Sequence, residues 1–396
     1  MGEIDKDYHQ LATENKIIIV MKILIFIDSI GAGGAEKSMV ELAKFLTKQP
    51  GFEVKFLCIN QQKIGFLEEV QSNDIPIIFF KDTSGYSKKL EFLNKTITEE
   101  NPDIIHSVLA ESNFLLRLVR VFNKRGKIIQ SLVSTPYTEE RKRDSQLPLL
   151  KYKMAKIFDE YSGKVNRGIH YHVITNEVLD HYREFLNIDD NYSLIYRGRR
   201  KNQYLDKNNT RNSNKFQLIN VGRQVFAKGQ LDILKALNYL RETNRLGTIK
   251  LKILGKEGKH TEALNEFVIK NKLENHVEIL GFVKNVEEEL AEANAFIFPS
   301  YYEGLGGALV EAFSAKLPVI CTNIPVLREV VGDEKGALFS NPGDFKHLAE
   351  NIYSLSKDQD LQSSLSTYSS KRFLENFQID NIHQEMLNMY LEVHRS

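Results

Sequence analysis

Two glutamates, Glu303 and Glu311, flank a glycine-rich turn. The turn consists of Gly304, Leu305, Gly306 and Gly307. It follows an apolar run that ends at Pro299 and opens a helix-like segment, whose free N–H groups and positive dipole end favour a bound anion. Two carboxylates beside an anion site suit a ligand with phosphate in its middle and hydroxyl groups at both ends, a layout that a nucleotide sugar has. The alternative interpretation is a flexible loop with two solvated glutamates.

Two cations form a second motif. Arg223 and Lys228 follow the buried run Phe216–Val221, five positions apart. Arginine offers a bidentate fork and lysine a point charge, so both can hold one diphosphate. No Asp-x-Asp pair falls in either motif, which predicts a diphosphate site without a metal ion. Two solvated cations on a loop are the alternative interpretation.

A glycine-rich turn also follows the first apolar run, at Gly33 and Gly34. It is similar to a dinucleotide-binding fingerprint, but Glu36 stands where the third glycine belongs. The second apolar run leads into Asn60 and not into an acidic residue. A nicotinamide-dependent oxidoreductase is therefore disfavoured, and we expect a loop that lets the backbone approach a sugar or a phosphate.

The elements that must position these motifs alternate between short apolar runs and longer amphipathic segments, which is the α/β pattern. Continuous apolar runs indicate parallel strands that are covered on both faces. The predicted strands are Lys22–Asp28, Val54–Ile59, Ile75–Phe80, Asp103–His106, Lys127–Val133, Tyr171–Thr175, Ser193–Tyr196, Phe216–Val221, Thr248–Leu254, Val277–Leu280, Ala295–Pro299, Pro318–Cys321 and Ala337–Phe339.

A polar stretch interrupts this rhythm after about 200 residues and divides the chain. We expect two doubly wound Rossmann-like domains that face each other across a cleft, where the strands' carboxyl ends bind ligands. The predicted divisions are an extension (1–20), an N-terminal Rossmann-like domain (21–200), a linker (201–214), a nucleotide-sugar domain (215–375) and a C-terminal helix (376–396) that can pack back on the first domain.

Composition sets limits on the class of protein. The length of 396 residues fits two domains, and the net charge of +1 gives no general attraction to nucleic acid. Two cysteines, Cys58 and Cys321, fall in predicted strands and fit a reducing compartment. The apolar run Ile17–Ile27 is too short to span a bilayer, which needs about 20 residues. We expect a cytoplasmic protein.

A basic stretch, Arg141–Lys156, lies in a region (117–200) with 17 Lys or Arg against 10 Asp or Glu. It is either a solvated surface or a surface that attracts an anionic membrane or a phosphate-linked acceptor. Apolar residues such as Leu149 and Leu150, with Tyr152, lie among these cations and can enter a bilayer interface. The sequence thus allows a peripheral position on the inner face of a membrane.

Taken together, the motifs resemble the retaining GT-B glycosyltransferases of family 4 (group 1). The resemblance covers nearly the whole chain from Lys22 and is most specific in the second domain. There the Glu-x7-Glu and Gly-Arg…Lys-Gly elements occur in the family's order, together with Leu280–Val283, Leu317–Thr322 and Glu329–Val331.

The resemblance implies a role for each motif residue. Arg223 and Lys228 would hold the diphosphate and offset charge on the leaving group, Glu311 would bind the ribose hydroxyls, and Glu303 would face the donor sugar near its anomeric carbon. Members of the family retain the anomeric configuration and need no metal or other cofactor. Further donor-binding positions would be Gly33, Gly34, Val283, Gly304, Leu305, Gly306 and Gly307.

The departures from the family pattern lie on the acceptor side. The stretch Ser131–Tyr137 lacks the histidine that the family often carries, and Arg197 and Gly198 replace the usual Asn-Gly before the linker. His106 and Thr135 remain as acceptor-side candidates, and a structural role is the alternative for His106.

The expected activity is transfer of a hexosyl or N-acetylhexosaminyl group, from a UDP-sugar by the family's habit, to a glycan, lipid-linked or protein-linked acceptor in bacterial-type surface glycan synthesis. Two alternatives stay open. One is a non-catalytic GT-B subunit that binds glycan or supports a partner enzyme, although all four charged motif residues are present. The other is a sugar-nucleotide epimerase, which transfers nothing to an acceptor.

Overall fold

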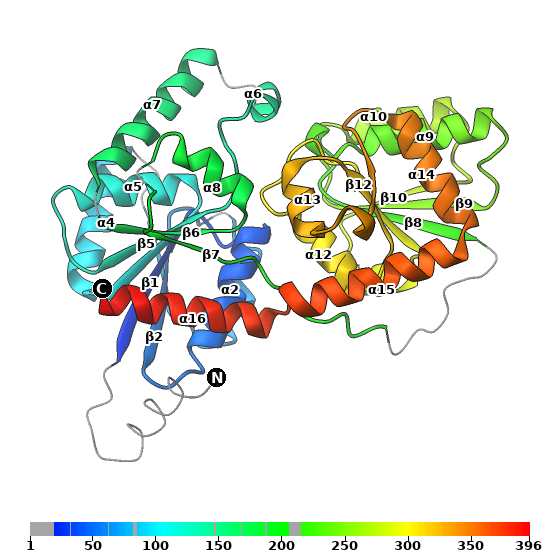
Figure 1. Cartoon of the computed structure of the whole chain (residues 1–396). Helices are drawn as coiled ribbons and strands as arrows, with labels where there is room; N and C mark the ends of the chain where they lie inside the picture. The colour runs from blue at the N-terminus through cyan, green and yellow to red at the C-terminus, as the bar shows by residue number, and fades with distance from the viewer. Residues whose placement is uncertain are drawn as a thin grey trace.

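The computed structural model describes residues 20–31, 33–61, 63–81, 85–145, 148–166, 168–186, 188–205 and 215–396. The expected extension, apart from Val20, and most of the expected linker lie outside these residues. Within them the chain forms two α/β domains that lie side by side (Figure 1).

The first domain is a seven-stranded parallel sheet in the order β3-β2-β1-β4-β5-β6-β7. Its strands are β1 (Met21–Ile27), β2 (Phe52–Cys58), β3 (Ile77–Phe79), β4 (Ile104–Val108), β5 (Lys127–Leu132), β6 (Ile169–Val173) and β7 (Tyr192–Leu194). The intervening helices are α2 (Gly34–Leu46), α3 (Leu67–Gln71), α4 (Tyr86–Glu100), α5 (Ala110–Arg120), α6 (Glu139–Ser145), α7 (Leu149–Val165) and α8 (Asn176–Arg183).

The second domain is a six-stranded parallel sheet in the order β10-β9-β8-β11-β12-β13. Its strands are β8 (Phe216–Val221), β9 (Ile249–Leu254), β10 (Val277–Gly281), β11 (Ala295–Phe298), β12 (Val319–Thr322) and β13 (Leu338–Ser340). Its helices are η1 (Phe226–Lys228), α9 (Gln230–Glu242), α10 (Thr261–Lys270), α11 (Val286–Glu292), α12 (Gly307–Ser314), α13 (Pro325–Val331), η2 (Glu334–Gly336), α14 (Phe345–Lys357) and α15 (Gln359–Asn376).

Both strand orders reverse beside the first strand of the domain, β1 and β8, which is the doubly wound topology predicted from the sequence. Most strand residues are buried because helices cover both faces of each sheet, although β2, β6 and β9 carry polar side chains at alternate positions. The free thiols of Cys58 and Cys321 are buried in β2 and β12. No helix in the described part of the chain is long and apolar enough to cross a membrane.

The last helix, α16 (Ile379–Arg395), leaves the second domain and lies along the first one beside α2 (Figure 1). Its buried side chains Ile382, Met386 and Tyr390 belong to the same apolar core as those of β1. The chain therefore passes between the domains twice. The two passages are hydrogen-bonded to each other, from Arg199 N to Phe377 O (2.8 Å) and from Ile379 N to Arg199 O (3.0 Å).

A buried chain of hydrogen bonds ties α16 to the sheet. Tyr390 Oη lies 2.5 Å from His106 Nδ1, His106 Nε2 lies 2.7 Å from Ser131 Oγ, and Ser131 Oγ lies 2.7 Å from His172 Nδ1. His172 Nε2 lies 3.0 Å from Ile195 O, a pure acceptor, so this nitrogen must donate. With both histidines neutral, the other directions follow: Ser131 donates to His172, His106 donates to Ser131, and Tyr390 donates to His106.

Burial opposes a positive charge on these rings. It lowers the pKa of His106 well below the usual value and lowers the pKa of His172 to about 4. The pKa values of His181 and His383 are also lowered to about 4, chiefly by burial. In the unfolded chain these rings take up a proton at a pKa near 6.5.

We therefore expect the free energy of unfolding to be highest above pH 6.5 and to fall as the pH decreases from 6.5 towards 4. In that window the unfolded chain binds protons that the folded chain does not, at about 1.4 kcal/mol per pH unit for each of the fully buried rings, His106 and His172. Urea unfolding between pH 7.5 and 4.5 measures the slope. His172→Gln should reduce it by about one proton, whereas the control His347→Gln, on the exposed side of α14, should not. Equal slopes for both variants would contradict the assignment.

Candidate active site

The predicted cations lie at the carboxyl edge of the second sheet. Arg223 follows β8 and is exposed, and Lys228 ends η1. Nζ of Lys228 lies 2.5 Å from Oε1 of Glu303 and 5.4 Å from the centre of the Phe298 ring. The side chain of Glu303 is only 10% exposed. The structure thus joins one predicted cation to one predicted carboxylate at the end of β11.

Close backbone contacts hold this pair in place. Tyr301 N donates to Ala227 O (2.8 Å), which binds the loop after β11 to η1. Gly229, at φ 61°, packs against Pro299: a Cβ there would lie 2.0 Å from the carbonyl oxygen of Pro299. Asn220 donates to Ile297 O (2.8 Å) and so links the ends of β8 and β11. The two loops therefore act as one support for Lys228 and Glu303.

The glycines before α12 have different physical roles. Gly306 has φ 82°, a left-handed conformation that other residues adopt at a cost. Gly304 instead allows contact with the first domain, because a Cβ there would lie 2.2 Å from the carbonyl oxygen of Val133. Gly307 opens the helix at the point where the Arg199 side chain approaches, 2.5 Å from the position of a Cβ. Only Gly306 is required for its φ angle.

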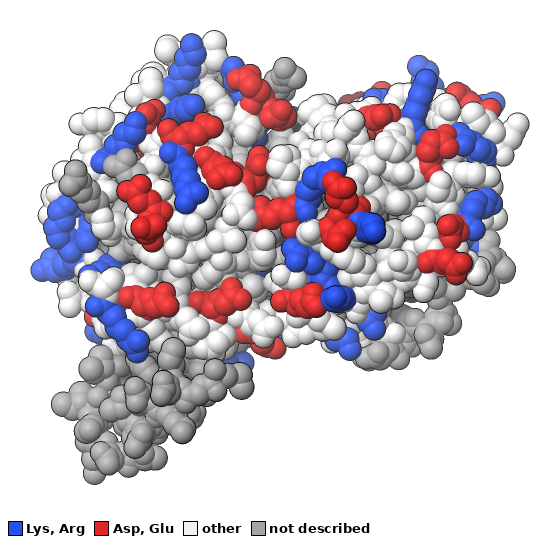
Figure 2. All heavy atoms as spheres, in the orientation of Figure 1, with Lys and Arg blue, Asp and Glu red and all other residues white. Residues whose placement is uncertain are grey.

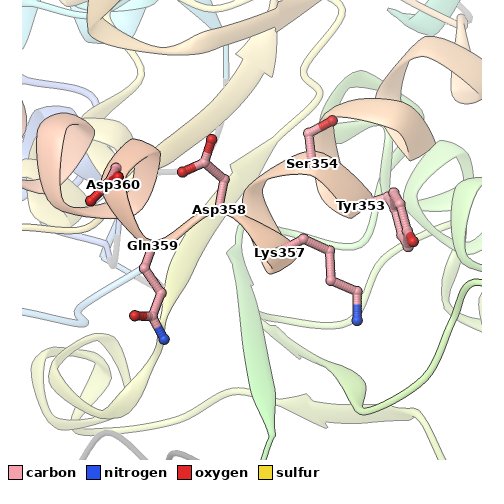
Figure 3. A pocket seen from close by; sticks show the side chains of 6 residues that line it. All are labelled: Tyr353, Ser354, Lys357, Asp358, Gln359 and Asp360. Atoms are coloured by element: carbon pink, nitrogen blue, oxygen red, sulfur yellow. The ribbon is translucent and has the colours of Figure 1, made fainter.

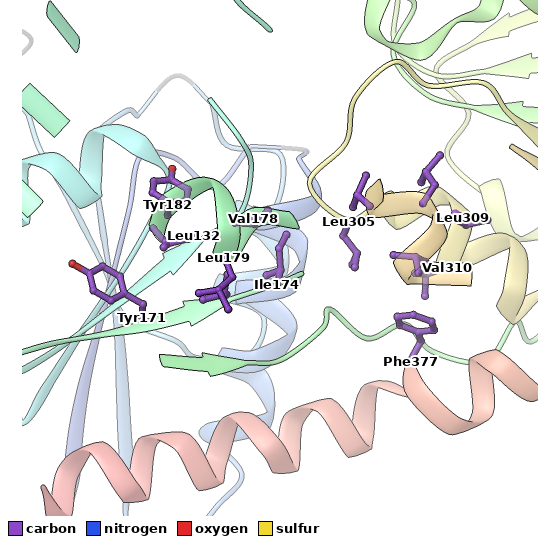
Figure 4. Close-up of a cluster of buried hydrophobic side chains, with 14 of the residues drawn as sticks. Leu132, Tyr171, Ile174, Val178, Leu179, Tyr182, Leu305, Leu309, Val310 and Phe377 are labelled. Atoms are coloured by element: carbon purple, nitrogen blue, oxygen red, sulfur yellow. The ribbon is translucent and has the colours of Figure 1, made fainter. Parts of the chain in front are cut away.

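Other contacts close the cleft around this loop. Thr175 Oγ1 donates to Gly304 O (3.1 Å), and the carboxylate of Glu329 on α13 accepts from Asn176 N (2.9 Å) and Tyr196 Oη (3.2 Å). Beside them, Ile174 and Val178 of the first domain and Leu305 of the second belong to one buried apolar cluster (Figure 4). The two domains are thus in direct contact along the site.

Glu311 lies inside α12 and takes partners from the first domain. Its Oε1 accepts a hydrogen bond from Arg199 Nε (2.9 Å) and lies 3.5 Å from Lys37 Nζ. The Arg199 side chain is 9% exposed and that of Glu311 is 21% exposed. In the sequence, Arg199 stands at the start of the polar stretch that was interpreted as a linker, and its role in the site was therefore missed. The one signal was the dense charge of the segment 197–200.

The first-domain wall of the cleft is the start of α2. Gly33 caps this helix and Gly34 is its first residue, with the Glu36 carboxylate packed against Gly33. Arg197 lies nearby. Burial, together with the positive charge of Arg199, lowers the pKa of Arg197 to about 9, and Glu36 partly offsets this. The wall thus brings a second helix N-terminus and a further cation to the site.

Three further residues were predicted from the sequence as members of the site: Val283, Thr135 and His106. Val283 follows β10 and packs, half-buried, against an apolar cluster, so its contact with a base stays a prediction. Thr135 is buried next to the Ser134 backbone that faces Gly304. His106 is fully buried and both of its ring nitrogens have partners, which supports the structural role that the sequence left open as the alternative. It is a structural histidine.

A hollow at the turn between α14 and α15 is lined by six residues shown in Figure 3: Tyr353, Ser354, Lys357, Asp358, Gln359 and Asp360. It lies at the end of the second domain that is farthest from the first (Figure 1). None of the predicted site residues lines it, so we place the candidate active site in the cleft.

Two facing, doubly wound domains with a site between them define the GT-B class, and a solved structure agrees. The chain is similar to Anabaena Alr3699/HepE, whose crystal structure is in complex with UDP and glucose, with a TM-score of 0.79 and 17% identity over 94% of this chain and 100% of that one. The family models "Glycosyltransferase Family 4" and "Glycosyl transferases group 1" match residues 32–201 and 202–372. The chain belongs to this family, which confirms the resemblance seen in the sequence.

The curated relatives are named as enzymes that transfer a sugar. The chain is 26% identical to the capsular polysaccharide biosynthesis glycosyltransferase CapH of Staphylococcus aureus, over 78% of this chain and 84% of that one. It is 22% identical to the N-acetylgalactosamine-N,N'-diacetylbacillosaminyl-diphospho-undecaprenol 4-alpha-N-acetylgalactosaminyltransferase of Campylobacter jejuni, over 89% and 95%. The matches to two other curated glycosyltransferases span 65% and 43% of their length.

Proposed function

We propose that this glycosyltransferase moves a hexosyl or N-acetylhexosaminyl group from a UDP-sugar to a glycan or lipid-linked acceptor, with retention of the anomeric configuration. The observation that carries the proposal is the placement of Glu303 and Glu311 on either side of the N-terminus of α12, with Lys228 bound to the first and Arg199 to the second. This matches the order of sugar, diphosphate and ribose in a nucleotide sugar.

The geometry suggests how the donor is activated. As the bond from the anomeric carbon to the diphosphate oxygen breaks, its electron pair remains on the phosphate, and Lys228 and Arg223 with the α12 N–H groups offset the new charge. The sugar ring gains oxocarbenium-like character, which the carboxylate of Glu303 stabilises. The acceptor oxygen bonds to the anomeric carbon on the face that the phosphate leaves, and the acceptor proton passes to a phosphate oxygen.

We propose that these positive groups do the work that a divalent cation does in other transferases. Lys228 lies against Glu303 just before α12, and the proposed diphosphate position is the N-terminus of that helix. Among the described residues, no group of three or more His, Cys, Asp and Glu could hold a metal ion. The transfer reaction should therefore run at its full rate in excess chelator.

The two glutamates should differ in kinetics, and transfer assays in the presence of chelator measure this. Glu303→Gln should lower kcat by about 10²-fold or more with a small change in KM, because its charge acts on the transition state. Glu311→Gln should raise KM for the donor roughly tenfold and leave kcat nearly intact, because contacts to the ribose are equally strong in the ground state and the transition state. NMR of the product reads the anomeric configuration.

The control is Glu350→Gln, an exposed glutamate on α14 far from the cleft, which should keep wild-type kinetics. Product with inverted configuration would refute retention. Identical kinetic signatures for the two variants would refute the division of labour, and loss of activity in chelator would refute the metal-free site. Turnover of the sugar nucleotide without transfer to any acceptor would favour an epimerase.

We also propose that α7 docks on the anionic inner face of a cell membrane. Seven apolar side chains of this helix are exposed: Leu149, Leu150, Met154, Ile157, Phe158, Tyr161 and Val165. Lys151, Lys153 and Lys156 lie among them, and Figure 2 shows cations over this end of the first domain, with acidic side chains close by. An apolar stripe with interspersed lysines suits a lipid interface, near which a lipid-linked acceptor would be found.

The surface differs from the predicted basic stretch in one respect. The guanidinium of Arg141 lies over the Tyr302 ring, 4.8 Å from its centre, and so faces the second domain. The side chains of residues 143–147 lie outside the described part of the chain. The docking surface is therefore α7 itself.

Binding to phosphatidylglycerol vesicles should weaken as salt rises from about 0.1 M, where charges are screened over about 10 Å, to 0.5 M. Ile157→Glu should reduce binding at low salt, because it places a charge in the apolar stripe. The matched control Ile269→Glu, equally exposed on α10 of the second domain, should not. Equal vesicle binding by the two variants, or equal binding of the wild type to neutral phosphatidylcholine vesicles, would refute the proposed membrane docking.

A further inference from the structure

Arg199 lies where the two passages between the domains cross. Its backbone N–H and carbonyl both pair with the segment Phe377–Ile379 that leads into α16. Gly198 makes the crossing tight, since a Cβ there would lie 2.6 Å from the Cα of Ile379. The backbone of Arg199 is thus fixed with respect to both passages, and its side chain extends from this point into the cleft.

The three guanidinium nitrogens of Arg199 have different surroundings. Nε donates to Glu311 (2.9 Å) and Nη1 donates to the carbonyl of Gly198 (2.9 Å). Nη2 points to the space between the two helix N-termini: it lies 2.5 Å from the position of a Cβ on Gly307 and 4.0 Å from that on Gly34. One fork therefore holds the carboxylate and also presents a donor at the proposed diphosphate position.

The excess of positive charge around the Arg199 side chain favours a bound anion. A guanidinium at the positive ends of α12 and α2 is unfavourable by itself. Lys37 and Arg197 lie close to the same place, and the positive charge of Arg199 contributes to the lowered pKa of Arg197. Glu311 and Glu36 offset only part of this positive charge. A diphosphate between the helix ends would receive N–H groups from both helices and neutralise the excess.

We propose that Arg199 is a donor-binding residue, which rests on the proposed function. Nη2 donates to the diphosphate of the nucleotide sugar, while Nε keeps the Glu311 carboxylate oriented for the ribose hydroxyls. Arg199 thereby acts on two adjacent parts of the donor, the diphosphate directly and the ribose through Glu311. Because its backbone lies at the crossing of the two passages, it also links donor binding to the closed arrangement of the domains.

The test compares UDP with uridine by isothermal titration calorimetry on wild-type protein, Arg199→Ala and Arg199→Lys. Arg199→Ala should weaken UDP by about tenfold or more and uridine by less than about threefold, since only UDP carries the diphosphate. Arg199→Lys should be intermediate for UDP, because a point charge replaces the fork. The matched control is Arg200→Ala, whose exposed side chain pairs with Glu41 away from the cleft, and it should bind as the wild type does.

The same titrations in a Glu311→Gln background separate a direct from an indirect role. A direct contact predicts that Arg199→Ala still weakens UDP there, while its effect on uridine disappears. Loss of the UDP effect in that background, or equal losses for UDP and uridine, overturns the proposal. Wild-type protein that binds neither UDP nor GDP would overturn the proposed function itself. Wild-type UDP binding that Arg199→Ala leaves unchanged would overturn this inference alone.

Discussion

The hydrogen-bonded ion pair between Arg199 and Glu311 is the interaction on which the rest of the site depends. It joins the end of the first domain to α12, the helix at which we propose that the nucleotide binds in the second domain. The Arg199 side chain is buried and that of Glu311 is partly buried, so water screens the pair less than it would a surface ion pair. The cleft contacts at Gly304 and Glu329 are possible only in the domain arrangement that this pair accompanies.

Elements outside the cleft hold the two domains in this arrangement. α16 is anchored in the first domain by its apolar face and by the hydrogen-bonded chain from Tyr390 to Ile195. It therefore fixes the second passage between the domains against the first. On the other side of the cleft, the shared support of η1 and the loop after β11 holds Lys228 against Glu303. Apolar packing of α16 and backbone hydrogen bonds at the edges of the cleft thus position the charged groups at its centre.

Much of this could be predicted from the sequence, because apolar runs define buried strands and their carboxyl ends converge. Lys228 and Glu303 follow β8 and β11, which are neighbours in the sheet, so their meeting follows from doubly wound topology. Arg199 was missed because its position depends on how two domains sit together, which no local pattern records. The role of His106 stayed open in the sequence for the same reason, since its partner Tyr390 is 284 residues away.

The central claim is that a nucleoside diphosphate binds where these charges and helix ends meet. The crystal structure of the chain with bound UDP tests it most directly. The account predicts that the phosphates lie at the first turn of α12, within hydrogen-bond reach of Arg199 and near Lys228, with the ribose hydroxyls on Glu311. UDP bound away from α12, for instance in the hollow at the α14–α15 turn, would contradict it.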